Sequence, residues 1–172
     1  QEVGIVPIVE PEVLMDGIHS IDICHEVSEK TFSKVFEELE KQRVYLEGIV
    51  LKPNMIISAL NCNNQADINK VAELTFKCLK DNVPSDVPGI AFLSGGQSSD
   101  LASAHLNEMN KKYSNEMPWN LTFSYGRALQ HDALNAWSGS DREKGQRALL
   151  NRAKNNSLSS KGLASDLYEN VN

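Results

Sequence analysis

A short apolar run followed by a helical pattern of apolar residues occurs four times along this chain, and this repetition constrains the fold more than any other feature. The runs are residues 4–9, 44–51, 89–93 and 121–124. Each predicts a strand, and the spacing of three and four after each run predicts an amphipathic helix. Strands that alternate with helices of this length pair in parallel through right-handed crossovers. The pattern therefore predicts an α/β fold with a parallel sheet.

Apolar side chains at helical spacing are expected to pack in the core and not to form a cofactor site. They are Ile23, Val27, Val35, Leu39, Ile68, Val71, Ala72, Cys78, Leu79, Leu101, His105, Met109, Leu129, Leu134 and Trp137. Residues 141–155 predict one more charged helix, and residues 156–172 predict a polar tail. No linker divides the chain, so one domain is expected.

Four β/α units do not close an eight-stranded barrel, which typically needs about 250 residues. The 172 residues therefore suggest half of such a barrel. An open doubly wound sheet is the structural alternative. It is weakened because no Gly-x-Gly-x-x-Gly turn follows the first predicted strand.

Composition excludes several classes of partner. The net charge of -6 and pI of about 5.2 argue against nucleic acid. No apolar stretch approaches the length of a membrane span, and a cytoplasmic protein is the default expectation. The three cysteines, Cys24, Cys62 and Cys78, lack Cys-x-x-Cys spacing. They predict reduced thiols and neither a disulfide framework nor a zinc site.

Lys52 is the strongest candidate for covalent chemistry. It ends the second apolar run and is followed by Pro53, which stops the strand and keeps the preceding residue extended. The amine is therefore expected at the carboxyl end of a strand. Partial burial there would lower its pKa and give the free amine that attacks a carbonyl to form a Schiff base.

Two carboxylates follow the first predicted strand. Glu10 and Glu12 flank Pro11, and an extended chain would direct both toward the same side. A carboxylate near an amine can protonate the departing hydroxyl of a carbinolamine and later take the proton back. His19, His25, His105 and His131 show no metal-ligand spacing, and they are interpreted as surface or packing residues.

The third and fourth strands run into polar, glycine-containing loops. These are residues 94–98, which contain Ser94 and Gly95, and residues 124–127, which contain Gly126 and Arg127. Glycine lets backbone N–H groups approach an anion, a helix N-terminus favours negative charge, and a guanidinium can bind phosphate through two hydrogen bonds. The two loops therefore predict a phosphate-binding site.

Four segments together closely resemble the class I fructose-bisphosphate aldolases. They are VPIVEPE at 6–12, LKPNM at 51–55, FLSGGQS at 92–98 and FSYGRAL at 123–129, and the similarity extends from about residue 4 to residue 162. The resemblance implies a (β/α)8 TIM barrel, of which this chain resembles strands five to eight with the C-terminal helix and a short tail. It also implies a lyase of glycolysis, gluconeogenesis or the Calvin cycle that cleaves fructose 1,6-bisphosphate into two triose phosphates without a metal or other cofactor.

The resemblance also implies roles for single residues. Lys52 would form the Schiff base, Glu10 would be the acid and base for imine formation, and Glu12 would hold the lysine region by hydrogen bonding. Ser94, Gly95, Gly126 and Arg127 would bind the ketone-side phosphate. A homotetramer and a cytoskeletal partner are implied as well. A plastid location is the alternative compartment, since a transit peptide would lie outside these residues.

Two other functions stay open. One is a Schiff-base lyase acting on another phosphosugar, and the other is a non-catalytic scaffold that keeps an aldolase-like surface. Lys52, Glu10 and Arg127 together disfavour the scaffold, because scaffolding needs none of them. The isolated 172 residues are expected to be inactive, since the resemblance places further site residues in the other half of the barrel.

Overall fold

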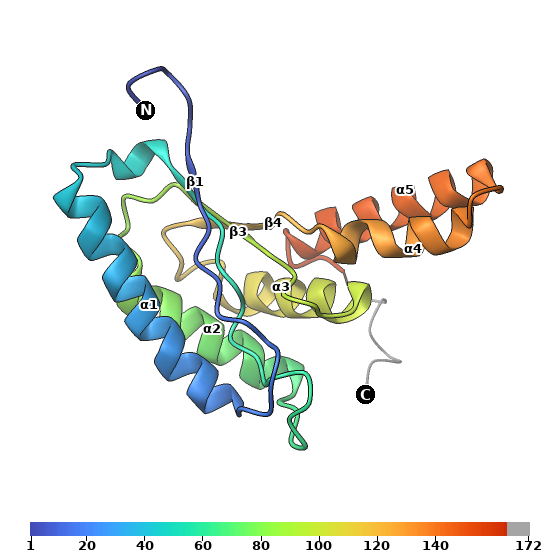
Figure 1. Ribbon diagram of the computed structural model, residues 1–172, viewed down its shortest axis with the longest axis horizontal. Helices are drawn as coiled ribbons and strands as arrows, with labels where there is room; N and C mark the ends of the chain where they lie inside the picture. The colour runs from blue at the N-terminus through green and yellow to red at the C-terminus, as the bar shows by residue number, and fades with distance from the viewer. Residues whose placement is uncertain (165–172) are drawn as a thin grey trace.

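The computed structural model describes residues 1–164 and contains one four-stranded parallel sheet in the order β1-β2-β3-β4 (Figure 1). The strands are Ile8–Val9 (β1), Val50–Leu51 (β2), Gly89–Phe92 (β3) and Asn120–Phe123 (β4). The helices are Ile21–Lys41 (α1), Ile68–Asn82 (α2), Ser99–Tyr113 (α3), Arg127–Trp137 (α4) and Arg142–Ser159 (α5). The predicted alternation of strands and helices with parallel pairing is confirmed.

Helices α1, α2 and α3 lie side by side along one face of the sheet, whereas α4 and α5 pack on each other and extend away beyond β4 (Figure 1). The core lies between the sheet and the first three helices. Its fully buried side chains include Phe32, Ile49, Leu51, Val71, Leu79, Ile90, Phe92, Leu106 and Met109. Burial of these side chains is the main favourable contribution to folding.

Four helices begin directly after a serine or aspartate that caps the N-terminus of the helix. The side chains of Ser20, Asp67, Ser98 and Asp141 each accept a hydrogen bond from the backbone N–H three residues later. Such a bond satisfies one of the unpaired donors in the first turn of a helix. The helix starts, and with them the ends of the preceding loops, are therefore fixed locally.

The first three predicted strands are longer than the observed ones, while the fourth is shifted by one residue. Residues 44–51 do not form a continuous strand, because a 3-10 turn, Leu46–Gly48, interrupts them before β2. In this turn the N–H of Gly48 donates to Tyr45 O and the N–H of Ile49 donates to Leu46 O. These backbone groups are therefore used within the turn and do not pair with β1.

The predicted core faces of two helices need correction. In α1 the buried positions are Ile21, Cys24, Ser28 and Phe32, while the predicted Ile23 and Val27 are exposed. In α4 the predicted Leu134 and Trp137 are also exposed. Helix α4 packs on α5 and α3, so Ala128 is buried and Leu129 packs against the core, while Leu134 and Trp137 remain at the surface of the helix pair.

The polar tail predicted from residue 156 begins later. Helix α5 continues to Ser159, and both Asn156 and Ser159 are buried. Ala164 is buried and donates its N–H to Asn107 of α3. Residues 165–172 of the predicted tail lie outside the described residues. In the described part of the chain, no helix has the length and apolar character needed to cross a membrane.

Candidate active site

The candidate residues follow the carboxyl ends of all four strands. Glu10 follows β1, Lys52 follows β2, residues 94–98 follow β3, and residues 124–127 follow β4. Parallel strands bring their carboxyl ends to the same edge of the sheet, which is where α/β proteins commonly bind ligands. The sheet thus places these polar segments along one edge.

Lys52 and Glu10 form an ion pair across the first two strands. The Lys52 Nζ lies 3.0 Å from Glu10 Oε1, and the side chain of Lys52 is 20% exposed while that of Glu10 is 47% exposed. The backbone N–H of Lys52 donates to Val9 O, and that of Leu93 donates to Pro53 O. Lys52 is therefore held between its neighbouring strands, with a carboxylate within proton-transfer distance of its amine.

Glu12 is exposed, and within residues 1–164 no hydrogen bond or ion pair joins its side chain to Lys52. The connection between the two segments is made by Asn54, which is 1% exposed. Its Oδ1 accepts from the N–H of Val13, and its Nδ2 donates to Ser28 Oγ and Met55 O. Sequence reasoning assigned Asn54 no role, although it lies in the LKPNM segment.

Two buried side chains, Gln97 and His105, support the loop after β3 through hydrogen bonds. The Gln97 Nε2 donates to Ser94 O at 3.0 Å, so its Oε1 is the acceptor for His105 Nδ1 at 2.6 Å. Burial lowers the pKa of His105 to about 4, so the ring is neutral at neutral pH and carries its proton on Nδ1. His105 is a packing residue, as predicted, and it also supports this loop.

The backbone conformation of this loop favours glycine at two positions. Gly95 has a φ of 55° and Gly96 a φ of 84°, values that other residues rarely adopt. A Cβ at Gly95 would also lie 2.8 Å from Met15 Cε. With glycine at these positions, no side chain keeps an anion away from the backbone N–H groups of the loop.

Arg127 opens α4 and lies beside the same loop. A Cβ at Gly96 would be 3.7 Å from an Arg127 terminal nitrogen. A cavity of about 330 Å³ separates the first turns of α3 and α4. Its lining is Gly96, Gln97, Ser98, Ser99, Asp100, Arg127, Ala128, His131 and Asp132. The structure thus places Arg127 beside Gly96, in the loop that also contains Ser94 and Gly95, whereas Ser94, Gly95 and Gly126 do not line this cavity.

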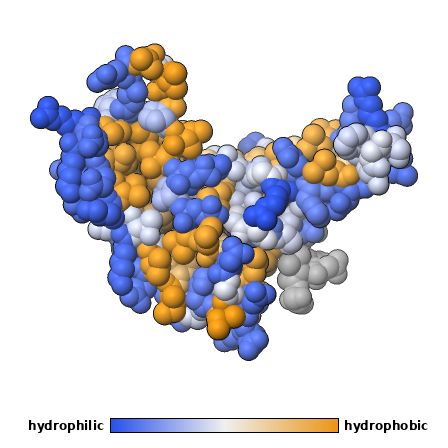
Figure 2. Space-filling model, in the orientation of Figure 1, coloured by the Kyte–Doolittle hydropathy of each residue, from blue (hydrophilic) through white to orange (hydrophobic). Residues whose placement is uncertain are grey.

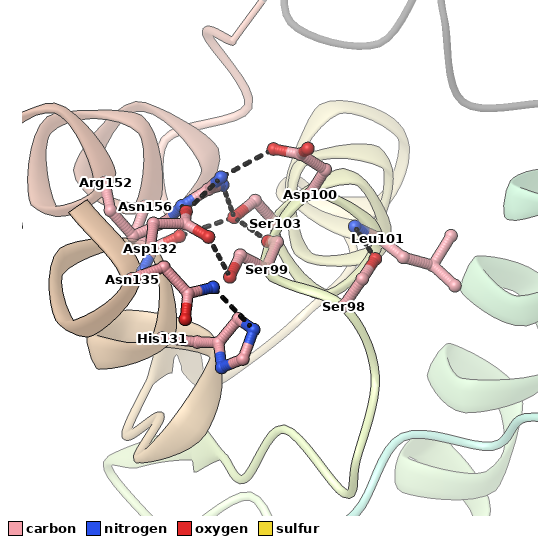
Figure 3. Close-up of polar contacts among 10 residues, drawn as sticks. All are labelled: Ser98, Ser99, Asp100, Leu101, Ser103, His131, Asp132, Asn135, Arg152 and Asn156. Carbon is pink, nitrogen blue, oxygen red and sulfur yellow. Dashed lines mark hydrogen bonds and ion pairs between the residues drawn. The ribbon is translucent and has the colours of Figure 1, made fainter. Parts of the chain in front are cut away.

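A buried arginine that sequence reasoning missed lies behind this cavity. Arg152 of α5 contacts Asp100 of α3 and Asp132 of α4, and Asp132 in turn accepts from Ser99 Oγ (Figure 3). The sequence offered no local signal for this cluster, because Arg152 is 52 and 20 residues from its two partners.

No group of three or more His, Cys, Asp or Glu side chains within residues 1–164 could hold a metal ion. Cys24, Cys62 and Cys78 are free thiols, as predicted. Burial raises the pKa of Cys78 to about 12, which keeps this thiol protonated.

Comparison with known proteins places the chain in a family. The family model "Glycolytic: Fructose-bisphosphate aldolase class-I" matches residues 1–170. A probable class 1 fructose-bisphosphate aldolase of Xanthomonas campestris is 49% identical over 165 residues, which cover 94% of this chain and 49% of the relative. Fructose-bisphosphate aldolase B of Sparus aurata is 49% identical over 161 residues, which cover 92% of this chain and 44% of the relative.

A solved structure agrees with the sequence relatives. The fructose-bisphosphate aldolase of Plasmodium falciparum, solved in complex with TRAP and a small-molecule inhibitor, superposes with a TM-score of 0.89 at 46% identity. The alignment covers 94% of this chain and 46% of that one, so the chain spans about half the length of the relatives it matches. The predicted fold class is confirmed as part of a TIM barrel, and the doubly wound alternative is excluded. The chain belongs to the class I fructose-bisphosphate aldolase family.

Proposed function

We propose that these four β/α units carry the Schiff-base half of an aldolase site, which in a complete barrel cleaves fructose 1,6-bisphosphate to dihydroxyacetone phosphate and glyceraldehyde 3-phosphate. The observation that carries the proposal is the pair of Lys52 and Glu10, 3.0 Å apart at the carboxyl ends of adjacent strands. An amine beside a proton-exchanging carboxylate is the minimum that imine chemistry needs.

The proposed reaction starts with a proton transfer from the Lys52 ammonium to the Glu10 carboxylate. The free amine adds to the substrate ketone and forms a carbinolamine. Glu10 then returns the proton to the departing hydroxyl, which leaves as water, and a protonated imine remains. This step restores the carboxylate for the next cycle.

The protonated imine supplies the driving force for bond cleavage. It accepts the electron pair of the breaking carbon–carbon bond and becomes an enamine, while the released half loses its hydroxyl proton to a base and becomes the aldehyde. Protonation of the enamine and hydrolysis of the imine free the second product. The proposal assigns the final hydrolysis to Glu10, which would again exchange protons at the nitrogen.

The ketone-side phosphate is assigned to the two loops beside this pair. Ser94 and Gly95 would bind it from the loop after β3, and Gly126 and Arg127 from the start of α4. The positive φ values of Gly95 and Gly96 and the closeness of Arg127 to Gly96 support this assignment. Glu12 is proposed to hold the lysine region once substrate is bound.

The compartment and assembly are proposals that rest on family membership. The relatives include bacterial and chloroplastic aldolases. We infer a cytoplasmic homotetramer, with a cytoskeletal partner as a further expectation. Native mass measurement and imaging of the tagged protein test these inferences, and a plastid location or a monomer would contradict them.

Borohydride trapping tests the chemistry. The native protein that contains this chain is incubated with dihydroxyacetone phosphate and sodium borohydride, and the adduct is located by peptide mapping. A reduced adduct on Lys52 is expected. Lys52→Arg should abolish both adduct and turnover, because a guanidinium stays protonated. Lys80→Arg, a change at an exposed lysine of α2, is the matched control. An adduct on another lysine would contradict the proposal.

A further inference from the structure

We propose that Arg152 is a positioning residue for the phosphate site: from α5 it fixes the distance between the first turns of α3 and α4, and thereby between the loop of residues 94–98 and Arg127. The inference rests on the proposed function, since it concerns the same phosphate site. It assigns a role in substrate binding to a residue that does not itself line the cavity.

The contacts of Arg152 span three helices (Figure 3). Its Nε donates to Asp132 Oδ2 at 2.9 Å, and one terminal nitrogen lies 2.8 Å from the same oxygen and 2.6 Å from Asp100 Oδ1. The other terminal nitrogen donates to Ser103 Oγ at 3.4 Å. One guanidinium thus joins α5 to α3 and to α4 at once.

The two carboxylates stand directly beside the proposed phosphate-binding loops. Asp100 is two residues after Ser98, the residue that caps α3 and lines the cavity. Asp132 is five residues after Arg127 on α4, and it also accepts from Ser99 Oγ at 3.2 Å. Both carboxylates lie within the first two turns of their helices, so a shift of either one moves the loop at the start of its helix.

Burial and charge explain why arginine is needed. The Arg152 side chain is 9% exposed, whereas those of Asp132 and Asp100 are 37% and 58% exposed. Without the guanidinium, two carboxylates would face each other across the gap between α3 and α4 and repel. The planar fork of arginine reaches both carboxylates, while the single ammonium of lysine cannot reproduce this geometry.

The test compares Arg152→Lys and Arg152→Gln with Arg147→Lys and Arg147→Gln in the native protein that contains this chain. Arg147 lies on the same helix, is 65% exposed and pairs only with Glu143 among the described residues. Imine formation is measured by borohydride trapping against dihydroxyacetone phosphate concentration, and against dihydroxyacetone, which lacks the phosphate. Inorganic phosphate is titrated as a competitor.

The Arg152 variants should need roughly three- to tenfold more dihydroxyacetone phosphate for half-maximal trapping, the effect of about one hydrogen bond, with a similar loss for inorganic phosphate. The maximal trapping rate and the response to dihydroxyacetone should match those of the Arg147 variants. Equal losses for both ketones, or no loss for either, would overturn the inference.

A second variant covers the case in which the Arg152 variants do not fold. Asp132→Asn keeps Arg152 paired with Asp100 but weakens the tie to α4, and circular dichroism melting verifies its fold. It should show the same selective loss for the phosphate-bearing ketone, and an unchanged response would overturn the inference. Failure of the proposed function is distinguishable, because the unaltered protein would then give no adduct at Lys52.

Discussion

At the scale of single residues, the carboxylate of Glu10 is 3.0 Å from the amine of Lys52, and proton exchange between them is what the proposed mechanism requires. Glu10→Gln keeps the size of the side chain but cannot give or take a proton. We expect the rate of imine trapping to fall by about 10²- to 10⁴-fold, the usual contribution of a general acid or base.

Glu12→Gln is the comparison for this experiment. Glu12 is exposed and is proposed to act by hydrogen bonding, which a glutamine amide can also do. Its trapping rate should stay within a few-fold of the unaltered protein. Equal losses in the two variants would indicate that the acidic pair acts only through charge.

Arg127 gives a prediction about substrate binding. Arg127→Ala should weaken binding of phosphate-bearing ketones by about 1.5 to 3 kcal/mol, the range for a hydrogen bond to a charged group. Binding isotherms with dihydroxyacetone phosphate and with dihydroxyacetone separate the phosphate contribution. If both ketones lose the same free energy, Arg127 has a structural role and does not bind phosphate.

His105 gives a prediction about pH and stability. In the folded protein burial lowers the pKa of His105 from 6.5 to about 4. The unfolded chain therefore takes up a proton near pH 6.5, while the folded protein does not until about pH 4. The free energy of unfolding should fall by up to about 1.4 kcal/mol per pH unit as the pH drops through this window.

His105→Asn should remove this part of the pH dependence, because its amide can donate to Gln97 Oε1 without titrating in this range. Urea unfolding at pH 7, 6 and 5 measures the difference between the two proteins. Parallel curves for the two proteins would show that His105 does not cause the loss.

The sequence predicts where the proposed site residues lie but not which residues support them. Lys52 and Arg127 lie at the same edge of the sheet, as the sequence predicts, because each follows a strand and the carboxyl ends of parallel strands share one edge. Asn54 and Arg152 were missed because the partners cited here are 20 to 52 residues away and meet them only through the tertiary fold. Local patterns carry no information about such pairs.

At the scale of elements, local patterns likewise predict the helices but not the way in which they pack. The sequence predicts each α-helix of the described residues, and it predicts α1 to α4 from apolar spacing, yet in α1 the apolar side chains lie on more than one side of the helix. Cys24 and Phe32 face the core, while Val27 and Val35 line a groove on the surface of the described residues, and Leu39 lies at this groove and also packs against the core. Apolar spacing predicts a helix, but it does not choose between two apolar faces.

The turn after α5 packs Gly162 against the end of α3, and this contact predicts an effect on stability. Gly162 has a φ of 67°, and a Cβ there would lie 2.7 Å from Lys111 N and 2.9 Å from Lys111 Cα. Since backbone must move to admit it, Gly162→Ala should reduce the free energy of unfolding by about 1 to 3 kcal/mol.

Gly139→Ala is the matched control for this turn. Gly139 also has a positive φ, 77°, but no atom lies within 4 Å of an added Cβ. Both variants carry the backbone strain and only Gly162→Ala carries the clash, so denaturant unfolding should show a larger loss for Gly162→Ala. Equal losses would mean that the contact with α3 can relax.

At the scale of the whole molecule, the sheet of the described residues has two open edges. Strand β1 pairs only with β2, and β4 pairs only with β3, within residues 1–164. Strand β1 and the segment that leads into it expose Val3, Ile5, Val6 and Ile8, each at least 60% exposed, and Figure 2 shows hydrophobic surface along this segment. Open edges beside apolar surface are sites of association with other chains.

These features predict the behaviour of residues 1–172 expressed alone. The polypeptide should associate in solution and should not cleave fructose 1,6-bisphosphate at a useful rate. One reason is that both edges of the sheet are open within residues 1–164, so no closed barrel surrounds Lys52. A second reason is that the chain offers a proposed site for one of the two substrate phosphates, so a bisphosphate would be held at one end and poorly oriented for attack.

Light scattering and a coupled aldolase assay on the purified polypeptide test the predicted association and inactivity. Both are measured first on the polypeptide alone and then after the complementary half of a relative's barrel is added. Cleavage should appear only after the second half is added, because closing the barrel pairs both sheet edges and excludes water from Lys52. Near-native activity from monomeric residues 1–172 would refute the half-barrel interpretation. Activity confined to a dimer of this polypeptide would instead show that two copies can cover each other's open edges.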